Sequence, residues 1–117
     1  RGLPVVLAQG GIHAGEIETS MMLALRPQAV RMERAEYFRS TSQDRAERFA
    51  ILGNGQSAKL GWMMQDYNPE GAVGHAAAAT ADKGRALLDA AGRALARLLA
   101  EIDQLPPDTL TDKTAFG

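Results

Sequence analysis

A single amphipathic segment dominates the sequence. From Thr80 to Gln104, apolar residues recur at three- and four-residue steps, the spacing of one face of an α-helix. They are Leu87, Ala91, Leu95, Leu98 and Ile102, and the opposite face carries Arg85, Asp89, Arg93, Arg97 and Glu101. Opposite charges four residues apart can pair along such a face. The pattern predicts a helix that packs through Leu87, Leu95, Leu98 and Ile102.

The ends of this segment carry helix signals. Thr80 is a suitable N-cap, and Pro106 and Pro107 end the helix. Gly84 and Gly92 each weaken a helix by about 1 kcal/mol relative to alanine, so we expect them to allow close packing. The tail from Pro107 to Gly117 has little apolar content, and we expect it to be flexible.

The amino-terminal segment combines a strand pattern with a helix pattern. Leu3–Ala8 is short, apolar and β-branched in its middle, which predicts a buried strand, and Gly10 and Gly11 close it. Apolar residues then recur at helical spacing over Glu16–Leu25, before Pro27. Strand, glycine-rich turn and helix form the building block of α/β folds.

The middle of the chain has weaker patterns. Arg39–Arg48 is polar and predicts an exposed surface excursion. Leu60–Gly74 mixes large apolar residues with turn formers and predicts an ordered loop, and His75 is expected in an exposed loop. Trp62 and Tyr67 either stack on a substrate or anchor a core or interface. The second interpretation is favoured because aromatic residues dominate such contacts.

The composition excludes several classes of protein. A net charge of −1 gives no general attraction to nucleic acid or to an anionic membrane, so neither is expected as a partner. Zero cysteines exclude disulfides and thiolate metal sites, which fits a reducing compartment, and we expect a cytoplasmic protein. No apolar run approaches the ~20 residues that a membrane span needs.

His13 stands in the glycine-rich turn and has three interpretations. It can bind a metal with Glu16 or Glu18, and a small metal-binding module would add His75, the other histidine of the chain. It can be a structural residue, hydrogen-bonded at a strand–helix junction. It can also be an acid/base at the mouth of a site, because α/β proteins bind ligands where parallel strands end. Spacing alone does not choose between the last two.

Two longer motifs resemble one enzyme family. The segment HAGEIETSMMLALRP, residues 13–27, resembles the creatininase (creatinine amidohydrolase) pattern His-Ala/Gly-Gly-x-x-Glu-Thr-Ser, followed by an apolar helix and Arg/Tyr-Pro. Residues 59–91 resemble the family's carboxy-terminal pattern, a Gly-x-Val/Ile-Gly step, an Ala-Thr-Ala-Glu/Asp-Lys-Gly cap and a final helix. The two motifs have the family's order and separation.

The resemblance implies a three-layer α/β fold with a mostly parallel sheet. It also implies hydrolysis of a C–N bond in a cyclic amide such as creatinine, two divalent metals (zinc or manganese), and a homo-oligomer, often a hexamer. The family's metal ligands come from a Glu-x-His pair, a following Asp and a Gly-His-x-Glu loop. This sequence contains neither motif, so we expect residues 1–117 to be the carboxy-terminal part of one such domain. On its own it should bind no metal and be inactive.

The resemblance also assigns roles to single residues. His13 aligns with the family histidine that passes a proton to the leaving nitrogen, and Glu18 would support it by holding His13 or the loop backbone. Glu16 falls in a variable pair and is expected to be solvated. Thr19 and Ser20 are expected to satisfy local backbone groups. The alternative function is a non-catalytic α/β remnant that serves subunit association.

Overall fold

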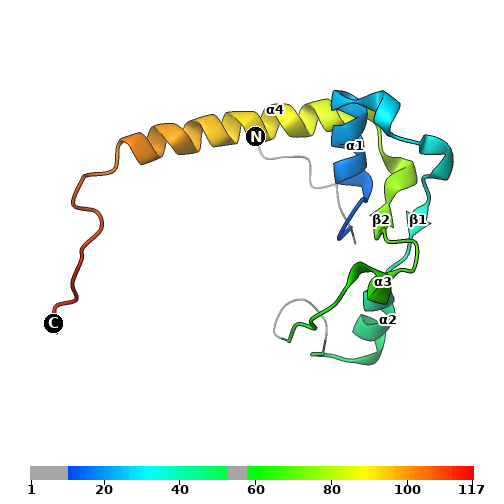
Figure 1. Cartoon of the computed structure of the whole chain (residues 1–117), viewed down its shortest axis with the longest axis horizontal. Coiled ribbons are helices and arrows are strands. Elements are labelled where there is room, and N and C mark those ends of the chain that lie inside the picture. Colours follow the sequence, from blue (N-terminus) through cyan, green and yellow to red (C-terminus); the bar gives the residue numbers. More distant parts are fainter. Residues whose placement is uncertain (1–10, 53–57) are drawn as a thin grey trace.

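The computed structural model describes residues 11–52 and 58–117 (Figure 1). The order of its longer elements is α1 (Glu16–Leu25), β1 (Tyr37–Phe38), α2 (Thr41–Arg48), α3 (Met64–Tyr67), β2 (Gly74–His75) and α4 (Ala81–Asp103). Short 3₁₀ turns lie at Pro27–Ala29, Met32–Arg34 and Ala76–Ala78. The predicted strand Leu3–Ala8 lies outside the described residues.

The two predicted helices are confirmed. α1 has the predicted bounds and ends before Pro27. α4 begins after Thr80, whose Oγ1 accepts a hydrogen bond from the Lys83 N–H at 3.2 Å, as expected of an N-cap. On its charged face, Arg93 Nε donates to Asp89 Oδ2 at 2.9 Å, and this hydrogen bond raises the pKa of Arg93.

The sheet differs from the prediction. β1 pairs with β2 in antiparallel register, Tyr37 opposite His75 and Phe38 opposite Gly74. Mixed helices and a small sheet are compatible with an α/β class, but the described residues form no three-layer fold and no mostly parallel sheet. The physical reason is that each of these strands is only two residues long, which is too short to build such a sheet.

The polar middle segment is a helix, not an irregular excursion. Ser40, nearly fully buried, accepts a hydrogen bond from the Ser42 N–H at 3.0 Å and caps α2. Asp44 of α2 pairs with the guanidinium of Arg39, which precedes the helix. The segment is polar and largely exposed, as predicted, because its charged residues find partners among themselves.

The packed part of the molecule is small and lies where α1 crosses the start of α4 (Figure 1). Leu87 of α4 is buried there as predicted, and Val73, which pairs with the turn before α1, is fully buried. The radius of gyration is 19.2 Å. A compact domain of this length would have about 13 Å, so the chain is extended.

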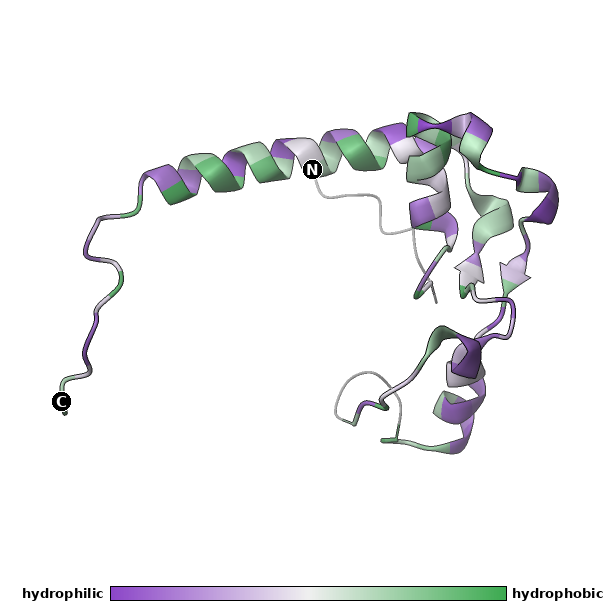
Figure 2. Ribbon diagram, viewed as in Figure 1, coloured by the Kyte–Doolittle hydropathy of each residue, from purple (hydrophilic) through white to green (hydrophobic). Residues whose placement is uncertain are grey.

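The cause of this extension is α4. Its carboxy-terminal half reaches away from the packed part, with apolar residues along it (Figures 1 and 2). Leu95, Leu98 and Ile102 were predicted to pack, but each is half-exposed, because α1 spans only the first turns of α4. No described helix combines the length and the apolar character required to cross a membrane. The tail after Pro106 is exposed throughout.

Candidate functional site

The turn that carries His13 is fixed to a second segment of the chain. The N–H groups of Ile12 and His13 donate to the Val73 carbonyl at 2.9 and 3.2 Å, and the Val73 N–H donates back to the His13 carbonyl at 2.8 Å. Val73 is fully buried. The backbone of His13 is therefore held from both sides by one buried residue.

Glycines permit this contact. Gly74 has φ +140°, and a Cβ there would lie 2.8 Å from the Cα of Gly15 and 3.0 Å from that of Gly11. Only glycine fits such an approach of two backbones. Ala14, directly after His13, has φ +53°, a left-handed conformation that is uncommon for residues with a side chain and concentrates at functional sites.

The side chain of His13 is exposed and borders a pocket of about 320 Å³. One wall comes from α1 and the other from the turns after it. The lining residues are His13, Ala14, Glu18, Thr19, Met22, Ala29, Val30 and Arg31. This volume lies at the small end of ligand pockets. An imidazole, a carboxylate and a guanidinium thus share one mostly apolar pocket.

Glu18 holds the loop backbone. Its Oε2 accepts a hydrogen bond from the Gly15 N–H at 3.2 Å. A glutamate at the third helical position often binds back to the N-cap in this way. Glu18 was expected to hold either His13 or the loop backbone, and the structure shows a contact with the loop backbone.

Glu16 is not solvated, contrary to the prediction. It forms an ion pair with Lys83, and its side chain is only 16% exposed. Lys83 Nζ also donates to the Ala78 carbonyl at 2.7 Å. The prediction failed because the partner lies 67 residues further along the chain, where a local pattern gives no signal.

Ser20 also contacts the start of α4. It is fully buried, and its Oγ accepts a hydrogen bond from the Thr80 N–H at 3.1 Å, so its partner is distant rather than local. Thr19 does bond locally, donating to the Ala14 carbonyl at 3.4 Å. Gly84 lies against the Ser20 backbone, which confirms its predicted close packing. Apart from the neighbouring helix backbone, no described residue lies within 4 Å of a Cβ at Gly92, where that prediction is wrong.

The two sequence motifs are therefore the two sides of one contact. The first motif supplies Glu16 and Ser20, and the second supplies Thr80, Lys83 and Gly84. The sequence profile of the creatininase family, creatinine amidohydrolase, matches residues 5–99. The chain belongs to the creatininase family. No curated protein and no solved structure matches the chain.

His13 was considered as a metal ligand together with Glu16, Glu18 or His75. The arrangement of these side chains in this creatininase-family chain does not fit a metal site. Among residues 11–52 and 58–117, no three His, Asp or Glu residues form a group that could hold a metal ion. Glu16 is paired with Lys83, and His75 is exposed in β2, its ring edge-on to Tyr37 at 5.2 Å. The small module of His13, Glu16 and His75 is therefore not formed.

The aromatic pair lies apart from the residues that line the His13 pocket. Tyr67 is buried, packs edge-on against Trp62 at 4.7 Å between ring centroids, and lies 5.0 Å below the guanidinium of Arg45. These contacts tie α3 to α2 and support the anchor interpretation for Tyr67. Trp62 is half-exposed.

Sequence reasoning missed two residues of this region, Lys83 and Arg31. Lys83 stands in the quoted Ala-Thr-Ala-Asp-Lys-Gly motif, where a lysine beside a helix cap was the available signal. Arg31 lines the His13 pocket, and within the described part of the chain it has no ion-pair partner. Its segment has no periodic pattern, so no local signal indicated this position.

Proposed function

We propose that this chain forms one wall of the substrate site of a metal-dependent creatininase-family amidohydrolase. In this proposal His13 passes a proton to the nitrogen that leaves when the C–N bond of a cyclic amide, such as creatinine, is hydrolysed. The observation that carries it is the position of His13, whose backbone is fixed by Val73 while its side chain borders a pocket.

The chemistry requires such a group. When water adds to an amide carbonyl, the C–N bond breaks readily only if the nitrogen gains a proton, because an amide anion is a poor leaving group. A histidine can give that proton and take it back near neutral pH. Fixing its backbone holds the proton donor beside the pocket before the substrate arrives.

The proposal assigns the metals to residues outside this chain. The described residues assemble no ligand group, and the sequence has neither ligand motif of the family. Divalent metals would activate the water and polarise the carbonyl when bound. The contribution of this chain is proton transfer and the shape of one wall.

The isolated 117-residue chain is accordingly expected to retain no stoichiometric zinc or manganese through gel filtration and not to hydrolyse creatinine. Metal analysis of the eluted protein and a creatinine assay on the same fractions check this. A complete family enzyme that has the Glu-x-His motif is the positive control. One or two metals per chain, with turnover, would contradict the expectation.

Glu18 is expected to act as a positioning residue. In the complete enzyme, Glu18→Ala should lower kcat about tenfold, the effect of roughly 1.4 kcal/mol. Glu18→Gln should lower it less, because an amide oxygen still accepts the hydrogen bond of Gly15, though without charge assistance. Steady-state kinetics measure both. A loss in Glu18→Gln as large as that of a His13 variant would show that the carboxylate itself takes part in the reaction.

The alternative function is a non-catalytic remnant that serves subunit association. This alternative is supported by the apolar residues along the free half of α4, which are half-exposed and could contact another subunit. The two functions are separated by the kinetics of a complete family enzyme, because only the first predicts that His13→Ala lowers kcat.

A further inference from the structure

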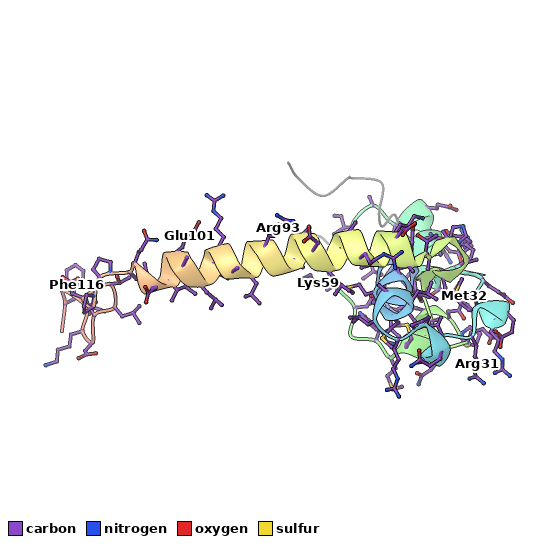
Figure 3. The ribbon with its side chains drawn as sticks, turned by 90° about the horizontal axis from the view of Figure 1, so that it is seen from above. Arg31, Met32, Lys59, Arg93, Glu101 and Phe116 are labelled. Atoms are coloured by element: carbon purple, nitrogen blue, oxygen red, sulfur yellow. The ribbon has the colours of Figure 1, made fainter. Side chains whose placement is uncertain are left out.

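Arg31 places a positive charge at the pocket that His13 borders. It belongs to the wall formed by the turns after α1, whereas His13 lies on the loop that precedes α1. Arg31 is exposed, and Figure 3 shows it at the edge of the packed part, far from the carboxy-terminal tail. A ligand that enters the pocket from solvent therefore meets an imidazole and a guanidinium on different walls.

Among the described residues, nothing pairs with the guanidinium of Arg31. It makes no ion pair and no hydrogen bond with any residue in the ranges 11–52 and 58–117. By contrast, Arg39 pairs with Asp44, and Arg93 pairs with Asp89. A guanidinium carries five N–H donors in a planar fork, and at Arg31 the described residues leave these donors available to a ligand.

The backbone of Arg31 is fixed between two short turns. The Val30 N–H donates to the Pro27 carbonyl at 3.1 Å, and the Arg34 N–H donates to the Arg31 carbonyl at 3.0 Å. Each of these hydrogen bonds closes a turn on one side of Arg31. The side chain therefore starts from an ordered position at the pocket wall, and ligand binding has to order only the side chain itself.

The negative charge of the pocket belongs to Glu18, which is engaged with the loop. Its Oε2 accepts a hydrogen bond from the Gly15 N–H at 3.2 Å, at the start of α1, where the helix dipole favours a negative charge. Although both residues line the pocket, no ion pair joins Glu18 to Arg31. Arg31 thus keeps its charge for a ligand instead of neutralising Glu18.

We propose that Arg31 selects substrates in which the amide also carries a carboxylate. A guanidinium binds a carboxylate through two parallel N–H···O bonds, which fix both the position and the orientation of the bound group. Such a contact would hold the amide in the pocket beside His13. The pocket, at about 320 Å³, suits a small molecule of this kind. The proposal rests on the amide hydrolysis proposed above and narrows its substrate class. Creatinine has no carboxylate and would lack this contact.

Isothermal titration calorimetry of the complete enzyme tests the selection with two probes of the same shape. They are 5-oxoproline and 5-oxoprolinamide, cyclic amides that differ only in a carboxylate against a carboxamide. The wild-type enzyme should bind 5-oxoproline roughly tenfold more tightly or better, as expected of hydrogen bonds between charged groups. The titrations are made at about pH 8, where free imidazole groups are mostly uncharged, so that an imidazolium does not add to the preference.

Arg31→Gln should abolish the preference and leave the affinity for 5-oxoprolinamide within about twofold of wild type. Arg31→Lys should keep part of the preference, because an ammonium group keeps the charge but not the planar fork. Arg34→Gln is the matched control. Arg34 is also exposed and has no ion-pair partner in the described part of the chain, but it does not line the pocket, so the preference should remain.

Two results overturn the proposal: a wild-type enzyme without the preference, or an Arg31→Gln variant that keeps it. The readout is binding, so it is independent of the proposed role of His13 in catalysis. His13→Ala should keep the preference for 5-oxoproline, whereas its kcat tests the proposed function. An unchanged kcat in His13→Ala would contradict that function, and an unchanged binding ratio in Arg31→Gln would contradict this inference.

Discussion

Replacing His13 by alanine in a complete family enzyme is expected to lower kcat by roughly 10²–10⁴, the usual contribution of a positioned acid or base. The reason is that the leaving nitrogen loses its proton donor, while the pocket keeps its other walls. Metal content should stay unchanged, because the described residues near His13 form no ligand group. Steady-state kinetics and metal analysis of the same preparation measure both quantities.

His75→Ala is the matched control, because His75 is the other histidine of the chain and is also exposed. It does not line the His13 pocket, so kcat should stay close to wild type. Two results would change the role of His13. Loss of metal in His13→Ala would make it a ligand, and an unchanged kcat would leave it a structural residue.

Gly84→Ala adds one methyl group to α4 and is expected to lower the free energy of unfolding strongly. A Cβ at this position would lie 1.9 Å from the carbonyl oxygen of Ser20 and 2.5 Å from its carbonyl carbon. These are backbone atoms of α1, so the clash can be relieved only by moving one helix away from the other. Overpacking costs about 1–3 kcal/mol and sometimes more, and we expect about 3 kcal/mol here. Urea denaturation followed by circular dichroism measures the free energy of unfolding.

The control is in the same helix. Beyond its own helix backbone, the described part of the chain places no atom within 4 Å of a Cβ at Gly92, so Gly92→Ala gains helix propensity without a clash. It should raise the free energy of unfolding by up to about 1 kcal/mol. Equal effects at the two glycines would show that α1 and α4 do not cross at Ser20 as described.

Local patterns were sufficient for α1 and α4. The apolar period, the cap at Thr80 and the proline after Arg26 lie within the elements that they define, so α1 and α4 could be predicted with their ends. The α2 helix was missed because its residues are almost all polar, which leaves no apolar period, and only its cap at Ser40 gave a signal.

Distant contacts could not be predicted from such patterns. Glu16 and Lys83 are 67 residues apart, and Ser20 and Thr80 are 60 apart. The sequence shows Glu16, Lys83 and Thr80 as polar residues at helix starts and Ser20 as a polar residue within α1, and none of them indicates a distant partner. The extent of packing along α4 was wrong for a related reason: periodicity shows which face is apolar but not how far a partner helix reaches.

The candidate site was predicted in part. The glycine-rich turn indicated that His13 would stand at a strand–helix junction, but the predicted strand lies outside the described residues. Glu18 was placed near the loop, and its contact with Gly15 agrees with that placement. The catalytic roles of both residues stay predictions. Arg31 could not be predicted, because it lines the pocket only where the turns after α1 fold back toward that helix.

In the proposed function, the reciprocal hydrogen bonds between His13 and Val73 lower the entropy cost of binding the substrate. Ordering one residue of a flexible loop costs about 1–2 kcal/mol, and a loop that orders only when substrate binds subtracts that cost from affinity. Here the backbone around His13 is ordered when the chain folds. In the proposed function, substrate binding then has to restrict only the rotation of the imidazole itself.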